Sequence, residues 1–587
     1  MRRSREVNSR RPGGSVSLLL SVVVLASCGC GGPPARPGAR APDRLQAPAA
    51  VAPQAPPAAR QISQEVRDKL LDGAMDVLGN LEAYDESAAF AQVFDRLNQW
   101  IHVVAAERTT AAVVGTDGPG GADQAALASD GWHADQLLAS LPERLRSADA
   151  VEALDDVAFN ASADIAALRD QRWLADIAAT ARGDALDDLE VARRLFDWTI
   201  RSLAIQSDPP MVPTETTPGS RWFHTGEILL AGRASAAQRA WVFLELVRHS
   251  GLDGVMLATG DAESGTLRPW IPAVLCGAEA HLFDPGYGMP IPGPGGEGVA
   301  TARQAAADPS VLAAMSLPDR PYPIQAADIG RLSVLVAATP WNLSRRMQLL
   351  DRHLAGSRRI DLAIDASAIA ARALAALPEA IVPSGNQAHQ SPAEGRQGLW
   401  EFPWETLARR ASGSRTVDIA LVKELAVMAV AFEQSNNGRD VRSFRPLYAA
   451  RIREFRGDLD GPDGAKVAYL MARPGNATIS DVVKGFPPQQ ADGVKRMYDE
   501  MKADATYWLG VLTLGEGEFE TAVDYLERMT LLANPEGVWA DAARANLARA
   551  RIGLGQTDEA ARLLRDDASS QRFGSRLIAA RIAPAAP

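Results

Sequence analysis

The fold is decided by the stretch GRASAAQRAWVFLELVRHSGLDGVMLATG, residues 232–260. Apolar residues recur at three- and four-residue spacing from near Ala234 to Val247, which predicts a helix, and Gly251 ends that pattern. Beyond it, short apolar runs bounded by turn residues predict strands at 254–258, 271–276 and 280–285. We therefore expect a small sheet packed on one helix.

Most of the remaining chain has a helical pattern, beginning with residues 62–203. The expected fold class is α+β, mainly helical, with the sheet-plus-helix core flanked by helical regions and a C-terminal helical repeat. In the middle of the chain the patterns predict a strand at 332–338, helices at 341–354, 417–432 and 444–455, and a polar loop at 383–398.

The helix and strands resemble a known family. In transglutaminase-like proteases a Gly precedes a Cys that opens the helix, an Ala follows one turn later, and an Arg and Gly-Leu lead into a strand. Arg268-Pro-Trp270 and Asp284-Pro285 are similar to the family's His-x-Trp and Asp-Pro motifs. The resemblance covers about residues 185–325. It implies a papain-like core and a thiol mechanism.

Two of the three catalytic positions depart from that pattern. Alignment on Arg248 and Ala240 places the family's cysteine at Ala236 and its histidine at Arg268, and only the aspartate, Asp284, is retained. An alanine has no nucleophile, and an arginine stays protonated and cannot act as a base. We expect a non-catalytic pocket, in which Arg268 forms a salt bridge with Asp284.

Two other residues near the helix and strands, Ser235 and Cys276, have side chains that could act as nucleophiles. Ser235 opens the helix, so an N-cap role is favoured over a serine nucleophile served by His224, His249 or His281. Cys276 and His281 are five residues apart on strands, which predicts that their side chains face opposite sides of the sheet. We therefore expect no catalytic residue, with Ser235, Cys276 and His281 as the fallback candidates.

The N-terminus has the features of an export signal. Five arginines precede an apolar run at 16–26, and Leu25-Ala-Ser-Cys28 resembles a bacterial lipobox. The resemblance implies a lipid on Cys28, which would anchor the chain to a membrane on the periplasmic side. Gly29 after the lipidated cysteine favours the outer membrane, by analogy with double-membrane bacteria.

Charge and composition restrict the partners of this chain. The 587 residues carry a formal charge of −11, and removal of a signal with five arginines and one glutamate leaves about −15. Nucleic-acid binding is disfavoured, because phosphate contacts need clustered Lys and Arg. The three cysteines, Cys28, Cys30 and Cys276, form no disulfide framework, and the seven histidines have no metal-ligand spacing. We expect neither a cofactor nor a metal.

A repeat is visible near the C-terminus. Leu509-Gly510, Gly517 and Ala522 recur 38 residues later as Leu547-Ala548, Gly555 and Ala560. This resembles two tetratricopeptide units, whose period is about 34 residues. The residues expected to allow close helix packing are Leu509, Gly510, Ala522, Leu547, Ala548 and Ala560. Such repeats present a groove to a protein or peptide partner.

These patterns divide the chain into six regions and favour one function. They are a signal peptide, a Pro/Ala-rich tether, a helical N-terminal region, the transglutaminase-like domain, a mixed middle region and the repeats, at residues 1–27, 28–60, 61–184, 185–325, 326–495 and 496–587. The favoured function is a membrane-anchored lipoprotein that binds or scaffolds proteins without catalysis. The alternative is a divergent peptidase, amidase or transferase that uses Ser235 or Cys276.

Overall fold

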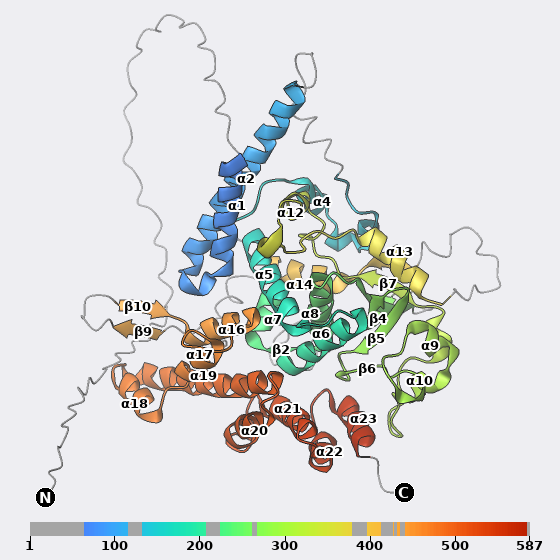
Figure 1. The fold of residues 1–587 in the computed structure, drawn as a ribbon, viewed down its shortest axis with the longest axis vertical. Helices are drawn as coiled ribbons and strands as arrows, with labels where there is room; N and C mark the ends of the chain where they lie inside the picture. The colour runs from blue at the N-terminus through green and yellow to red at the C-terminus, as the bar shows by residue number, and fades with distance from the viewer. Residues whose placement is uncertain are drawn as a thin grey trace, which may run out of the picture.

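The computed structural model is mainly helical, with a small mixed sheet near one end of the molecule (Figure 1). It describes residues 64–114, 132–161, 163–206, 224–260, 267–378, 396–412, 427, 431–434 and 441–583. The predicted signal peptide, the tether and Cys28 lie outside the described residues. The helices and the small sheet confirm the predicted fold class, which is α+β and mainly helical.

The N-terminal region begins with a helical hairpin. Helix α1 (Gln64–Gly79) packs against α2 (Glu86–Val114). After the 3₁₀ turns η2 (Gln136–Ser140) and η3 (Glu143–Leu145) come the helices α4 (Ala148–Asp155), α5 (Ala163–Arg182) and α6 (Asp188–Ser202). The apolar residues at 137–145 form these short turns instead of the expected longer helix, because Pro142 separates them.

Helix α8 (Ala236–His249) forms at the centre of the molecule, where the sequence predicts it. Ser235 begins it with a capping box: its hydroxyl accepts from the Gln238 amide, and the Gln238 side chain accepts from the Ser235 amide. The residues from Gln238 to Val247 are buried. Helix α8 is therefore enclosed on all sides, and only its N-terminal end lines a cavity.

The sheet has six strands in the order β6-β5-β4-β3-β7-β8. All neighbouring strands are antiparallel except β7 and β8, which are parallel. Their bounds are β3 (Gly254–Gly260), β4 (Leu267–Cys276), β5 (Glu279–Asp284), β6 (Met289–Pro290), β7 (Ser333–Val336) and β8 (Gln397–Leu399). All the strands expected from the apolar runs are present.

Both faces of the sheet are covered. Met256 and Val274 belong to the hydrophobic core that includes α6 and α8. Val255 and Ala273, one position along each strand, belong to a second core that includes α9 (Ala302–Ala307) and α13 (Ala366–Ala376). This burial on both faces explains why the strands read as continuous apolar runs rather than alternating ones.

The middle region departs from two expectations. The helix predicted at 417–432 is contradicted at its end, because Ala431–Gln434 forms β9, which pairs with β10 (Val441–Phe444) in an antiparallel hairpin. Periodicity does not distinguish a short apolar helix from a strand, so pairing with the partner strand decides. The polar loop predicted at 383–398 is contradicted at its end, where β8 pairs with β7. The other parts of these two segments, 383–395, 417–426 and 428–430, lie outside the described residues. The remaining short elements are β1 (Ala204–Ile205), β2 (Arg233–Ala234), α7 (Thr225–Ala231), α10 (Pro309–Ala313), α11 (Ala326–Ile329), α12 (Arg345–Asp351), α14 (Glu401–Ser412) and α16 (Pro446–Arg456).

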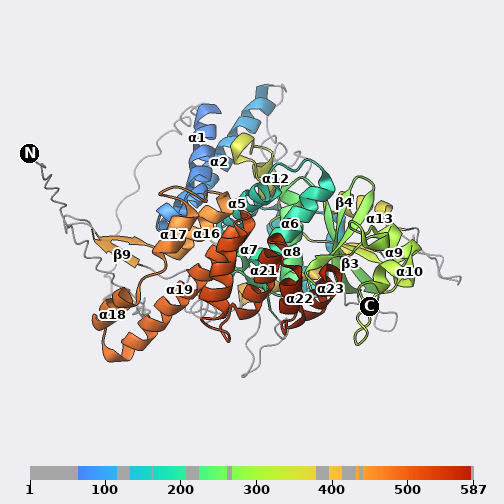
Figure 2. The ribbon, with the colours of Figure 1, turned by 60° about the horizontal axis from the view of Figure 1, so that its bottom comes forward.

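The C-terminal helices form antiparallel pairs. They are α17 (Ala465–Met471), α18 (Asn476–Lys484), α19 (Pro488–Gly515), α20 (Phe519–Val523) with a π-helical continuation at 524–531, α21 (Ala540–Gly553), α22 (Thr557–Arg565) and α23 (Arg572–Ile582). The six residues expected at close helix contacts are all buried. A Cβ added to Gly510 would lie 2.8 Å from Leu526, so a glycine is required there for close approach. Figure 2 shows α21, α22 and α23 following one another, and each of these helices contacts the next.

Candidate functional site

The three positions that the family resemblance assigns to a catalytic triad line one cavity of about 590 Å³. Ala236 is the first residue of α8, Arg268 lies near the start of β4, and Asp284 ends β5. A Cβ added to Gly286 would lie 3.6 Å from the Ala236 methyl group and 3.3 Å from Asp284 Oδ1. The helix N-terminus and the turn after β5 are therefore in close contact at the base of this cavity.

The carboxylate of Asp284 is buried and is bound by three donors. Its Oδ1 accepts from the backbone amides of Gly286 and Tyr287, each at 2.9 Å, and its Oδ2 accepts from the Tyr322 hydroxyl at 2.7 Å. Burial raises the pKa of Asp284, and these hydrogen bonds counteract that effect. Asp284 therefore stabilises the turn that follows β5.

The prediction of a salt bridge between Arg268 and Asp284 is wrong. Arg268 is exposed and lies opposite Thr259 in the ladder between β3 and β4, and no ion pair joins it to Asp284. A buried carboxylate needs hydrogen-bond donors, but backbone amides and a tyrosine satisfy that need without a buried cation. The arginine is left at the edge of the cavity.

Tyr322 is a site residue that the sequence did not identify. It lies 38 residues after Asp284, in a segment without a motif. Its hydroxyl donates to Asp284 and accepts from the Trp270 indole at 3.2 Å. Burial and the adjacent carboxylate raise the pKa of Tyr322 well above its ordinary value, so the hydroxyl stays a neutral donor. The sequence motifs identified the two ends of this chain of hydrogen bonds, Trp270 and Asp284, but not the tyrosine that joins them.

Ser235 is placed as a helix cap, as predicted. Its side chain is 3 % exposed, and its Oγ accepts from the Gln238 amide at 3.3 Å. The candidate bases make other contacts: His224 stacks on Trp341, and the Nε2 atom of His249 lies 2.8 Å from the Gln171 side chain. The described residues therefore offer Ser235 no imidazole partner.

The strand pair β4–β5 overturns one expectation about Cys276 and His281. Their register, with Cys276 opposite Glu279 and Val274 opposite His281, places both on the same face of the sheet. The turn at 277–278 reverses the chain, so counting along one strand gives the wrong parity. His281 Nδ1 nevertheless contacts the Val299 carbonyl at 3.2 Å. Burial, followed by nearby carboxylates, raises the pKa of the Cys276 thiol to about 12. The geometry gives no thiolate–imidazole pair.

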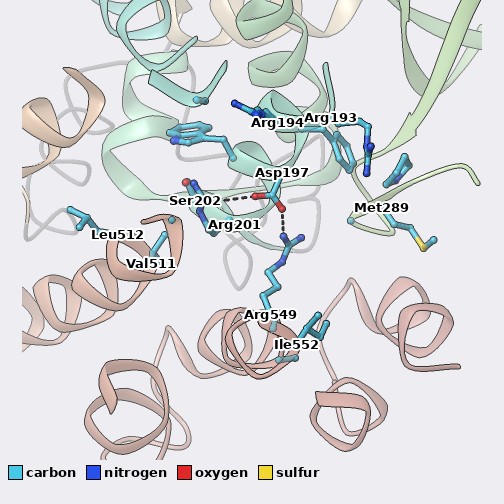
Figure 3. Close-up of a pocket in the computed structure, with 18 of the residues that line it drawn as sticks. Arg193, Arg194, Asp197, Arg201, Ser202, Met289, Val511, Leu512, Arg549 and Ile552 are labelled. Carbon is cyan, nitrogen blue, oxygen red and sulfur yellow. Dashed lines mark hydrogen bonds and ion pairs between the residues drawn. The ribbon is translucent and has the colours of Figure 1, made fainter. Parts of the chain in front are cut away.

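A second, larger cavity of about 820 Å³ lies between α6 and the C-terminal helices (Figure 3). Asp197 on α6 forms ion pairs with Arg201, at 2.9 Å, and with Arg549 on α21. Burial raises the pKa of Asp197, but the two guanidinium groups outweigh burial and lower it overall. The charged lining residues balance, with four arginines, three glutamates and one aspartate. No sequence motif predicted this cavity, because its walls come from segments that are far apart in the chain.

Neither cavity contains groups suited to a metal ion. Within the described part of the chain, no three His, Cys, Asp or Glu side chains come close enough together to coordinate one. No helix in that part is sufficiently long and apolar to cross a bilayer.

Comparisons with protein-family models, with curated proteins and with solved structures found no match to this chain.

Proposed function

We propose that this chain is a lipid-anchored extracytoplasmic protein that binds a protein partner, and that its transglutaminase-like core is non-catalytic. The observation that carries the proposal is the cavity at the N-terminus of α8. The residue that opens the helix there is Ala236, which has only a methyl group, and Asp284 is engaged by a turn and by Tyr322. A thiol mechanism needs a thiolate at the position of Ala236 and an imidazole at the position assigned to Arg268.

The packing of α8 on the sheet supports the proposed transglutaminase-like core. The helix packs on the antiparallel strands β3 and β4, and the positions assigned to the cysteine, histidine and aspartate line the same cavity. The helix pairs α19–α20 and α21–α22 support a tetratricopeptide-like array, since small residues occupy their contacts. Such arrays bind proteins or peptides and perform no chemistry.

Electrophile labelling tests the absence of catalysis. Folded full-length protein is treated with a fluorophosphonate and with iodoacetamide, and modified residues are mapped by mass spectrometry. We expect no stoichiometric labelling of Ser235, and slow labelling of Cys276 because its pKa is about 12. Denatured protein, in which Cys276 should react fully, is the control. Stoichiometric labelling of the folded protein that disappears on substitution of His224, His249 or His281 would overturn the proposal.

The lipid anchor is tested separately. The proposed anchor is a lipid on Cys28, and the described helices include none that could span a bilayer. Cys28→Ala should therefore move the protein from the detergent phase to the aqueous phase in a partitioning assay. Cys30→Ala, two residues along the chain, is the matched control and should partition like the wild type. Equal partitioning of wild type and Cys28→Ala contradicts lipid anchoring.

A further inference from the structure

We propose that the cavity at the N-terminus of α8 binds a carboxylate carried by a peptide of the partner, either its C-terminal carboxylate or an Asp or Glu side chain. This inference rests on the proposed function, since it assumes that the bound peptide is held rather than cleaved. It concerns the same cavity that Ala236, Arg268 and Asp284 line.

The cavity is positively charged within a negatively charged chain. Its lining includes three exposed arginines, Arg268, Arg320 and Arg331, against two carboxylates, Asp284 and Asp328. Asp284 is held inside by its three donors, and Asp328 accepts from the Gln325 amide at the start of α11. None of the three arginines forms an ion pair with another described residue. Arg320 is hydrogen-bonded to the Tyr287 side chain, so the charges of Arg268 and Arg331 are the ones most available to a ligand, although the chain as a whole carries −11.

Two of the three exposed arginines are positioned by their surroundings. The Arg320 guanidinium lies 4.1 Å from the centroid of the Phe573 ring, which restricts its motion. Arg268 lies on β4 just before a register shift in the pairing with β3, and such bulges redirect side chains. A guanidinium presents two parallel N–H donors that match a carboxylate, so this group can be bound in a bidentate manner.

The helix adds to the positive potential. Helix α8 has 14 residues, and its first two, Ala236 and Ala237, line the cavity. The capping box engages the amides of Ser235 and Gln238 but not those of Ala236 and Ala237, the two residues that line the cavity. The partial positive charge of a helix N-terminus favours an anion there.

The walls of the cavity suit a peptide better than a bare ion. Trp270, Tyr287, Tyr322 and Trp400 contribute aromatic surface, and Trp270 and Tyr287 are only half-buried. The volume of about 590 Å³ lies within the range of small-molecule sites. Aromatic rings pack against apolar side chains and planar amides, while the arginines bind the charged end.

The experiment uses two peptide pools and the full-length protein. Random-sequence tetrapeptides, prepared as free acids and as C-terminal amides, are equilibrated with the protein by dialysis, and retained peptides are identified by mass spectrometry. We expect retention from the acid pool. From the amide pool we expect retention only of members with Asp or Glu if a side-chain carboxylate suffices, and no retention if the C-terminus is required.

Variants locate the binding site. The double variant Arg268→Gln, Arg331→Gln should reduce retention at least tenfold, and Ala236→Leu, which fills the cavity without a change in charge, should reduce it similarly. Arg528→Gln removes one positive charge from an exposed position outside the cavity and should retain peptides like the wild type. Thermal unfolding verifies that each variant is folded.

The outcomes separate this inference from the proposed function. No retention from either pool, equal retention by wild type and the double arginine variant, or displacement of peptides by equimolar inorganic phosphate contradicts the carboxylate site. Cleaved or cross-linked peptides in the dialysate would instead contradict the non-catalytic function, whether or not carboxylates are preferred.

Discussion

The Asp284 carboxylate stabilises the turn that follows β5 by accepting hydrogen bonds from two amides of that turn. In the resembling family an aspartate orients an imidazole, but here the same position caps the turn formed with Gly286 and Tyr287. Burial raises the pKa of Asp284, so the folded protein binds this proton more tightly than the unfolded chain does. Its contribution to stability is therefore complete below the ordinary aspartate pKa and declines as the pH rises through the raised value.

Substitution of Asp284 tests this role. Asp284→Asn keeps an acceptor for the two amides but does not titrate, so its unfolding free energy should gain on that of the wild type as the pH rises from about 4 to about 7. Asp284→Ala removes the acceptor and should cost about 1–3 kcal/mol. Denaturant unfolding at several pH values measures both effects. Asp463→Asn, at an exposed position, is the control, and an Asp284→Asn variant with the same pH profile as the wild type would contradict the prediction.

At the level of elements, helix α8 and the C-terminal helix pairs follow from local patterns, whereas β9 does not. The signal for α8 is the combination of a Ser–Gln capping box, a long apolar run and a closing glycine. In the C-terminal helices, small residues recur where helices touch: Ala522 and Ala560 are completely buried. The apolar run that ends at Phe432 suits either structure, and the pairing of 431–434 with 441–444 makes this end of it a strand.

The close contact at α20 gives a prediction about stability. Ala522→Arg would place a long charged side chain between packed helices, and we expect it to lower the unfolding free energy on the order of 3 kcal/mol. Thr521→Arg introduces the same side chain at the adjacent exposed position and should have little effect. Thermal unfolding of the two variants provides the comparison. Similar melting temperatures for both would remove the argument for close packing of these helices.

At the scale of the whole molecule, Arg239 joins the core to the C-terminal helices. It is 2 % exposed, and its guanidinium donates to the carbonyl groups of Leu203 and Pro285 and to the Gln571 side chain. These partners come from the end of α6, from the turn after Asp284 and from the start of α23. One buried side chain in α8 thus links three segments that are distant in the sequence.

Loss of this link should affect the whole molecule. Arg239→Met leaves several buried acceptors without donors and should cost about 3 kcal/mol or more. Arg239→Lys keeps the charge but lacks the planar fork, so it should recover only part of the loss. Arg303→Met, on an exposed arginine, is the control. Denaturant unfolding combined with limited proteolysis of the C-terminal helices measures the effect, and an Arg239→Met variant as stable as the control would exclude this role.

The fold class, helix α8 with its Ser235 cap, and the strands that follow it could all be predicted from the amino-acid sequence, because capping and apolar periodicity are local properties. The sequence also brought Ala236, Arg268 and Asp284 into one hypothesis, and all three line one cavity. The partners of these residues, by contrast, follow from the tertiary structure. Tyr322 in place of Arg268 as the neighbour of Asp284, the shared face of Cys276 and His281, and the position of Arg239 among three segments all depend on contacts between residues far apart in the chain. Local sequence patterns do not predict such contacts, because the packing of the whole molecule determines which side chains lie close enough to hydrogen-bond a buried polar group.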